Sequence, residues 1–183
     1  MKTLTTILPT CAASVSLLLA AGAALAQTTP TSSAHRPAPP PKSATVPRPS
    51  LDASLHALQA SFAKAHEMGI SVSCAILDVR GDLVAFARMD DASFLTVSLA
   101  EGKALASAMF GLPSRDLGRM AASPLFASIN ASVQDRMVPA QGALPVLRDH
   151  RVIGAIGCSG GAPPQDEAAA EAGLGALRDA VGH

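Results

Sequence analysis

Few side chains in this chain of 183 residues are placed to perform catalysis. The five histidines are scattered and never fall at the spacing of a metal site. Ser159 lies in Gly-Cys-Ser-Gly-Gly, which is not the spacing of a hydrolase nucleophile elbow. We therefore predict no catalytic residue. Enzymatic activity stays uncertain, and binding is favoured over turnover.

Axial ligation of haem iron is a weaker requirement, because a single side chain is enough. Five side chains are chemically able to do this, and nothing in their spacing chooses among them: His66, Met89, Met109, Met137 and Cys158. We take His66, Met109 and Cys158 as the candidate metal ligands. For His66, at the edge of an apolar helix face, the alternative is an ordinary solvated histidine.

Residues 154–161 form a glycine-rich segment, Gly-Ala-Ile-Gly-Cys-Ser-Gly-Gly. It matches neither a dinucleotide fingerprint nor a phosphate loop. Glycines let a ligand or another backbone come close, and free amides ahead of a helix can hold an anion such as a carboxylate. A plain turn from strand to helix explains the segment equally well. The sequence leaves both interpretations open.

The N-terminus has the pattern of a cleavable signal peptide. Lys2 precedes a largely apolar stretch at residues 7–20, and Ala24-Leu25-Ala26 supplies the small residues of a cleavage site. A transmembrane anchor is the alternative, but no stop-transfer charges follow. We predict a signal peptide at residues 1–26, a periplasmic or secreted mature protein, and no membrane insertion after cleavage.

Residues 27–50 contain seven of the fourteen prolines and no apolar stripe. Such a segment buries too little apolar surface to offset the entropy of ordering it, so we predict a disordered linker. The remaining residues, 51–183, form one domain. Removing Lys2 leaves 13 basic residues against 14 acidic ones, a net charge of about −1. Without a basic patch, we expect no nucleic-acid partner.

Periodicity along the domain predicts alternating helices and hairpins. Ser50 is the expected N-cap of a first helix, whose apolar stripe is Leu51, Leu55, Leu58, Phe62 and Ala65. Strands follow at 70–76 and 83–89, then a helix at 96–110, short helices from Ser114 and Ser123, a loop, strands at 144–148 and 152–158, and a helix from Pro163.

Asp78 opens the turn between the first two predicted strands, where a carboxylate most often accepts hydrogen bonds from backbone amides. A catalytic carboxylate is the alternative. The element order predicts an α+β fold, with an antiparallel sheet of two hairpins flanked by helices.

Residues from about 51 to 181 resemble the GlcG/HbpS family. The matching segments, in family order, are Val72-Ser73-Cys74-Ala75-Ile76-Leu77-Asp78, then Gly81 to Asp90, Gly102-Lys103-Ala104, Phe110-Gly111-Leu112-Pro113-Ser114, and the glycine-rich segment with Gln165-Asp166. The resemblance implies a profilin-like domain, usually oligomeric. Some members of this family bind haem or related tetrapyrroles, and some are linked to haem degradation or redox sensing.

The family's recurrent polar and glycine positions imply candidate pocket residues in this chain. Besides Asp78, the implied ligand-binding residues are Arg88, Lys103, Gly160, Gly161, Gln165 and Asp166.

Two cysteines remain after signal cleavage, Cys74 and Cys158, and export would place them in an oxidising compartment. Two small buried apolar residues are the alternative to a bridge. In the profilin-like sheet implied by the resemblance, the first and last strands are neighbours. We therefore expect the two cysteines to be adjacent. Both a disulfide bond and a pair of free thiols remain compatible with that expectation.

The leading hypothesis is an exported protein that binds a small ligand, with haem or a related tetrapyrrole as the cofactor. The alternatives are an enzyme that degrades haem through the reactivity of haem itself, and an oligomeric interaction module without a ligand. An Ala-rich helix and few charges also predict a homo-oligomer.

Overall fold

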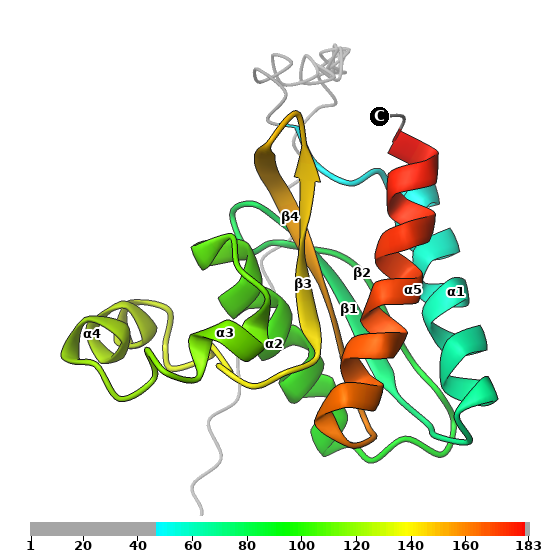
Figure 1. Cartoon of the computed structure of the whole chain (residues 1–183), viewed down its shortest axis with the longest axis horizontal. Helices are drawn as coiled ribbons and strands as arrows, with labels where there is room; N and C mark the ends of the chain where they lie inside the picture. Colours follow the sequence, from blue (N-terminus) through cyan, green and yellow to red (C-terminus); the bar gives the residue numbers. More distant parts are fainter. Residues whose placement is uncertain (1–46, 182–183) are drawn as a thin grey trace, which may run out of the picture. The chain divides into compact units, whose positions relative to one another are not determined.

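The computed structural model describes residues 47–181 (Figure 1). The predicted signal peptide and most of the predicted linker lie outside these residues. The elements, in chain order, are α1 (Leu51–Glu67), β1 (Ser73–Asp78), β2 (Leu83–Arg88), α2 (Leu95–Phe110), α3 (Ser114–Leu117), α4 (Pro124–Ser132), β3 (Ala143–Arg148), β4 (Arg151–Ser159) and α5 (Pro163–Val181).

The four strands form one antiparallel sheet in the order β2-β1-β4-β3. Each hairpin pairs within itself, and β1 joins β4 at the centre, from Ser73 opposite Ser159 to Asp78 opposite Gly154. This confirms the predicted α+β class and the two hairpins.

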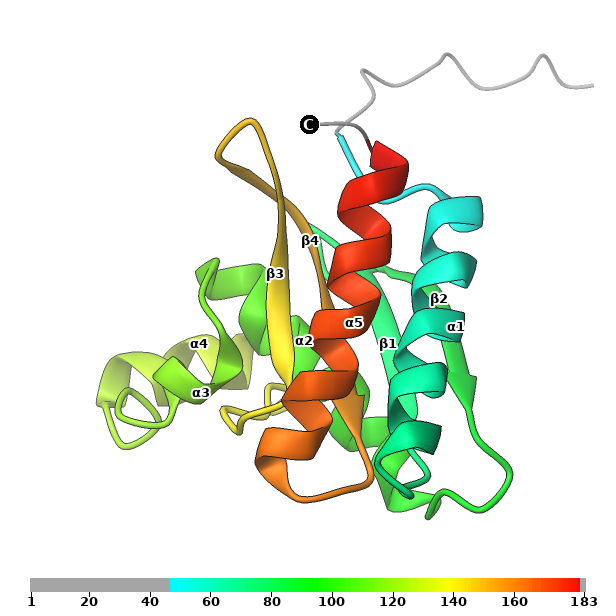
Figure 2. The ribbon, with the colours of Figure 1, turned by 45° about the vertical axis from the view of Figure 1, so that its right-hand side comes forward.

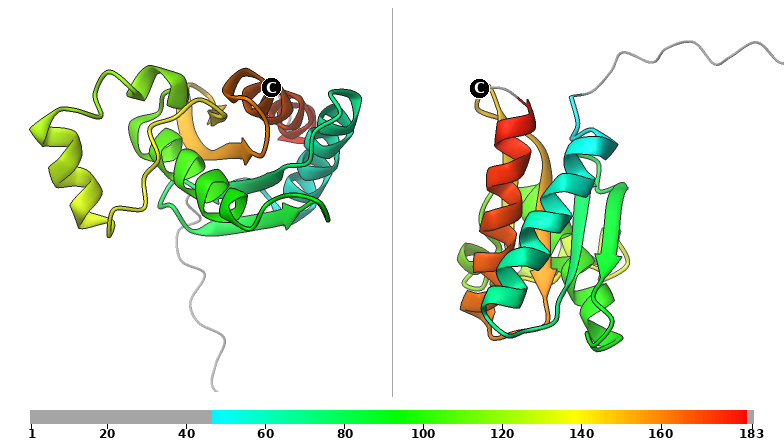
Figure 3. Two further views of the ribbon diagram at one scale, coloured as in Figure 1. Left: turned by 90° about the horizontal axis from the view of Figure 1, so that it is seen from below. Right: turned by 90° about the vertical axis from the view of Figure 1, so that its right-hand side faces the viewer.

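Helices cover both faces of the sheet (Figures 2 and 3). α1 and α5 lie side by side on one face, where Val72, Cys74 and Ile76 of the β1 segment point into their core. α2 covers the other face, where Leu77 packs against Ala104 and Leu105. Every residue of β1 is buried, because both faces of this central strand are covered. Strand β1 therefore offers no surface side chain, whereas the edge strand β2 has exposed residues at both of its ends.

The buried face of α1 differs from the predicted stripe. Leu51 and Leu55 are 56% and 46% exposed, whereas the buried positions of this helix are Ala53, Ser54, Ala57, Leu58, Ser61 and Ala65. Gly173 of α5 explains the difference, since a Cβ there would meet the side chain of Ser61 and lie 2.9 Å from the carbonyl oxygen of Ala57. The two helices pack closely through small residues, which leaves the two leucines outside.

The domain begins slightly before the predicted boundary. Pro49 is fully buried, and its ring lies against Gly154 of β4. Ser50 is the N-cap of α1, as predicted, and its hydroxyl accepts a hydrogen bond from the amide of Ala53 at 3.3 Å. The last residues assigned to the linker thus belong to the folded domain.

No helix within residues 47–181 combines the length and the apolar character needed to cross a bilayer.

Candidate functional site

A pocket of about 300 Å³ opens where the ends of α1 and β2 meet. Its lining comes from α1 and from the segments next to β1 and β2: Phe62, His66, Ser71, Arg88, Met89, Asp90 and Asp91. Phe62 and His66 are four residues apart, so they share one face of α1. The fold thus brings together His66 and Arg88, which the sequence analysis selected on separate grounds.

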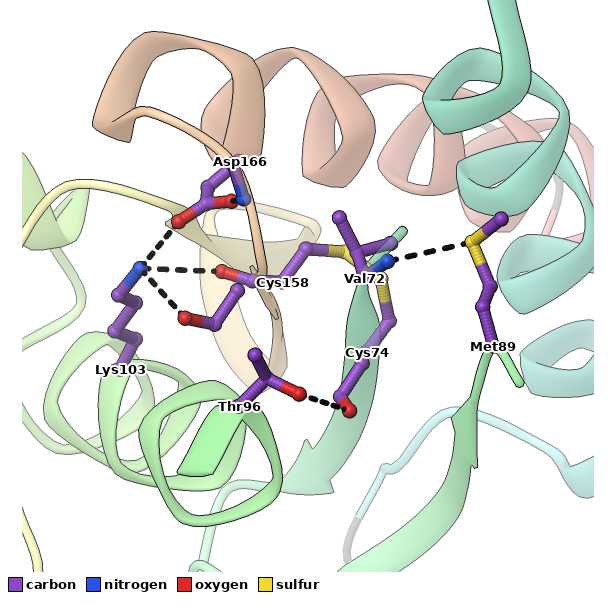
Figure 4. The surroundings of a disulfide bond; sticks show 10 residues. Val72, Cys74, Met89, Thr96, Lys103, Cys158 and Asp166 are labelled. Atoms are coloured by element: carbon purple, nitrogen blue, oxygen red, sulfur yellow. Dashed lines mark hydrogen bonds and ion pairs between the residues drawn. A yellow bond between two sulfur atoms is a disulfide. The ribbon is translucent and has the colours of Figure 1, made fainter. Parts of the chain in front are cut away.

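Met89 is fixed at the wall of this pocket by two contacts with Val72. Its amide donates to the carbonyl oxygen of Val72 at 3.0 Å, and its Sδ accepts the amide of Val72 at 3.3 Å (Figure 4). Residues on either side of the first hairpin therefore hold the thioether in one place.

The pocket combines an exposed imidazole, a thioether, an aromatic ring and an exposed guanidinium, with two carboxylates on its rim. Within residues 47–181, no three His, Cys, Asp or Glu side chains are grouped to hold a metal ion by themselves. A ligand that carries its own metal needs only one protein donor, and His66 supplies one. Arg88 can pair with a carboxylate of such a ligand.

Lys103 and Asp166 form a separate, buried cluster. Their ion pair is 2.7 Å long, and their side chains are only 6% and 3% exposed. The Lys103 ammonium also lies 3.3 Å from the hydroxyl of Ser159 and 3.4 Å from the carbonyl oxygen of Cys158 (Figure 4). An ammonium has three donors, so three acceptors satisfy it. The side chain of Lys103 is thereby fully engaged inside the domain.

The same cluster closes the turn between β4 and α5. The second carboxylate oxygen of Asp166 accepts the amide of Gly161 at 2.8 Å, and Gln165 accepts the amide of Ala162 at 3.0 Å. The amides of Gly161 and Ala162 are therefore already hydrogen-bonded within the chain and are not free to bind an anion. Ligand contact by Gly161 and Gln165 stays a prediction.

Gly160 lies between the buried cluster and the pocket. A Cβ at this position would run into the carbonyl oxygen of Ser71, a pocket residue, and would lie 2.8 Å from Cα of Val72. Gly160 is therefore required for the close approach of the turn to the pocket wall. Its contact with a ligand stays a prediction.

Cys74 and Cys158 are directly opposite each other on β1 and β4 and form a disulfide, with their Cα atoms 4.1 Å apart. The amide of Cys158 donates to Gly142 at 2.8 Å, on the side away from β1. The cysteines therefore form a non-hydrogen-bonded pair, the type that brings strands closest. The expected adjacency is confirmed. The prediction of Cys158 as a metal ligand is wrong for the disulfide-bonded protein, because a sulfur in a disulfide cannot be a thiolate.

Two further candidates lie outside the pocket. Met109 is on α2, with 42% of its surface exposed, and does not line the pocket of His66. One carboxylate oxygen of Asp78 accepts the amides of Arg80 at 2.8 Å and Asp82 at 3.1 Å. The predicted turn-capping role of Asp78 is confirmed.

Sequence reasoning missed most of the pocket wall, namely Phe62, Ser71, Asp90 and Asp91, and it did not single out Met89. The spacing of Phe62 and His66 on one helix was the available signal. The predicted first hairpin brings Ser71 and Met89 together, but the packing of α1 beside β2, which adds Phe62 and His66, is not revealed by local periodicity.

The fold and the pocket define a single α+β domain whose antiparallel sheet lies between helices, with one histidine at the end of α1. The family model described as "Haem degrading protein HbpS-like" matches residues 50–175. This chain belongs to the HbpS-like family.

Three relatives illustrate the similarity. An uncharacterised 15.0 kDa protein encoded between dhaT and dhaS of Citrobacter freundii is 30% identical over 125 residues, 68% of this chain and 88% of that protein. The crystal structure of Klebsiella pneumoniae ORFY superposes with a TM-score of 0.66 and 27% identity over 75% of this chain and 95% of that one. The PduOC–haem complex gives a TM-score of 0.61 and 27% identity over 67% of this chain and 91% of that one.

Proposed function

We propose that this chain is an exported haem-binding protein and that the pocket of His66 holds the haem. The observation that carries the proposal is the meeting of His66, Met89 and Arg88 in one pocket. Membership of the HbpS-like family and the likeness to PduOC, whose structure was solved with haem, support it. The signal-peptide pattern at residues 1–26 supports export to the periplasm or the exterior.

Four of the seven pocket residues have a distinct part in this proposal. The exposed imidazole of His66 would hold the haem iron, and the thioether of Met89 is the second donor in the same pocket. Arg88 would pair with a propionate, and Phe62 would supply apolar surface for the macrocycle. Bound haem would contribute the redox and oxygen chemistry of its iron.

The size of the pocket supports assembly into a homo-oligomer. A volume of about 300 Å³ is at the lower end for sites that enclose even a drug-sized molecule. Haem held by His66 would extend beyond the pocket of one copy, and a second copy would cover the exposed part. The exposed leucines Leu51, Leu55 and Leu83 lie at the opposite ends of α1 and β2 from this pocket, so they would contribute only if the contact ran along both elements.

Haem degradation is a second candidate function, favoured by the description of the matching family model. The pocket contains a serine, a histidine and two carboxylates, but within residues 47–181 no ion pair joins His66 to Asp90 or Asp91. We therefore assign the reactivity to haem itself. The two functions differ in whether bound haem persists in the presence of a reductant and oxygen.

Titration of the mature chain, residues 27–183, with hemin separates these functions. Binding predicts a shifted Soret band that saturates at a fixed ratio of haem to protein. Degradation predicts that the band then bleaches when ascorbate is added in air, faster than for haem bound to albumin. Absence of a saturable Soret change would contradict both haem binding and haem degradation. The remaining hypothesis would then be an interaction module that binds no ligand.

A further inference from the structure

A second and larger pocket, of about 550 Å³, lies between the β1–β2 hairpin and α2. A loop that precedes β3 closes its third side. Its apolar floor consists of the buried Leu77 and Leu105 and the half-buried Leu99 and Val138, and the exposed Leu83 borders it. None of its lining residues is a histidine, cysteine or methionine, so this pocket offers no iron ligand of the kind present beside His66.

The mouth of this second pocket carries an excess of negative charge. Its polar residues are Asp82, Ser98, Glu101, Asp135 and Arg136. Asp82 pairs with Arg80 at 3.0 Å, and Arg136 donates to the carbonyl oxygen of Val133 at 3.3 Å.

Glu101 is the least exposed of the three acidic residues at this mouth. Its side chain is half-buried and has neither an ion pair nor a hydrogen bond to any residue from 47 to 181. A partly desolvated carboxylate above an apolar floor is best compensated by a cation that also has apolar surface.

The loop side of the pocket is held in place by specific bonds. The amide of Val138 donates to the carbonyl oxygen of Gly102 in α2 at 3.0 Å. Gly102 permits this contact, because a Cβ there would lie 2.6 Å from both the carbonyl oxygen of Arg136 and Cγ2 of Val138. Asn130 accepts the amides of Asp135 and Met137, each at 2.9 Å. The shape of the pocket is thus present before any ligand binds.

We propose that this pocket binds a small organic ammonium compound with an apolar body. The carboxylate of Glu101 pairs with the ammonium, and the leucine floor contacts the apolar part. Asp135 adds negative potential at the mouth. This site is separate from the pocket of His66 and does not depend on haem binding.

Isothermal titration and NMR chemical-shift mapping with phenethylamine test the proposal. Two analogues of similar shape test the requirement for a cation: phenethyl alcohol, which is uncharged, and hydrocinnamate, which is anionic. We expect the amine to bind and to shift amides of the floor and mouth residues. We expect the Glu101→Gln variant to bind the amine about tenfold more weakly, since it loses a charge-assisted pair. Glu171→Gln, at an exposed glutamate of α5, is the matched control and should bind within about twofold of the natural chain.

A second variant blocks the pocket without changing its floor. Ser98 is exposed at the mouth, so Ser98→Trp fills the entrance while the fold, checked by thermal melting, is kept. It should abolish amine binding and leave the Soret titration with hemin unchanged. Equal binding of the amine and the alcohol, an unchanged affinity in Glu101→Gln, or shifts that map elsewhere would each overturn the proposal. Failure of haem binding would not affect it.

Discussion

The carbonyl oxygen of Cys158 accepts a hydrogen bond from the ammonium of Lys103 at 3.4 Å. Cys158 of β4 therefore forms the disulfide with Cys74 and also contacts the buried ion pair between Lys103 and Asp166. The disulfide ties β4 to β1, and the ion pair ties α2 to the start of α5 (Figure 4). These two cross-links secure the end of β4 next to Gly160, which packs against the wall of the His66 pocket.

The disulfide should make a large contribution to stability. It spans 84 residues of sequence, and the chain-entropy model gives about 4 to 5 kcal/mol for a loop of this length. We expect the free energy of unfolding in urea to fall by about this amount when the mature protein is reduced. Thiol titration of the denatured, unreduced protein should find no free thiol. Two free thiols would show that the bond is absent.

Breaking the ion pair from one side should be costly. Lys103→Met leaves the carboxylate of Asp166 buried without its partner, and we expect a loss of about 3 to 5 kcal/mol in unfolding free energy. The double variant Lys103→Met/Asp166→Leu should lose less than Lys103→Met alone, because no charge remains buried.

The exposed pair Lys64–Glu67 provides the control for this cycle. Its side chains are 42% and 66% exposed, so Lys64→Met should change stability by less than about 1 kcal/mol. Additive losses from the two substitutions in the buried pair would contradict a direct interaction between Lys103 and Asp166.

Gly160 should tolerate no side chain. Gly160→Ala forces the Cβ into the backbone at Ser71, and we expect a loss of about 2 kcal/mol with a weaker Soret response to hemin. Gly175→Ala is the matched control, because its added Cβ has no atom within 4 Å apart from the nearby backbone of its own helix, α5. It should be neutral or stabilise by up to about 1 kcal/mol. Equal melting temperatures for the two variants would refute the packing role of Gly160.

Two truncations test where the domain begins. A chain that starts at residue 47 should melt within about two degrees of the chain that starts at Gln27, because the removed residues are the predicted linker. A chain that starts at Leu51 also loses the Ser50 cap and the buried Pro49, and should melt several degrees lower. Equal melting temperatures for all three chains would show that the domain begins at residue 51.

The sequence was sufficient for the elements whose signals are local. The alternation around Cys74, the turn at Asp78, and the caps at Ser50 and Ser123 correctly predicted the hairpin and the starts of α1 and α4. Hydrophobic periodicity failed at Leu51 and Leu55, because the face of a helix that packs closest is selected by small size as well as by apolar character.

The candidate site was only partly predictable, because its residues meet through non-local packing. His66 and Arg88 could be chosen by chemistry or by resemblance, but their common pocket depends on the packing of α1 beside β2. A lysine is rarely buried unless its charge is paired. The burial of Lys103 therefore could not be predicted locally, because its partner Asp166 lies 63 residues later in the chain. Cys158 could be chosen by residue type, whereas its disulfide depended on strand order.

The most direct test of the proposed haem site is a comparison of two histidine variants in the hemin titration. His66 lines the pocket, and His56 is exposed on the same helix but outside it. We predict that His66→Ala loses the shifted Soret band of the natural chain or binds hemin about tenfold or more weakly, whereas His56→Ala keeps the natural spectrum and affinity. A natural spectrum and affinity in His66→Ala would contradict the site.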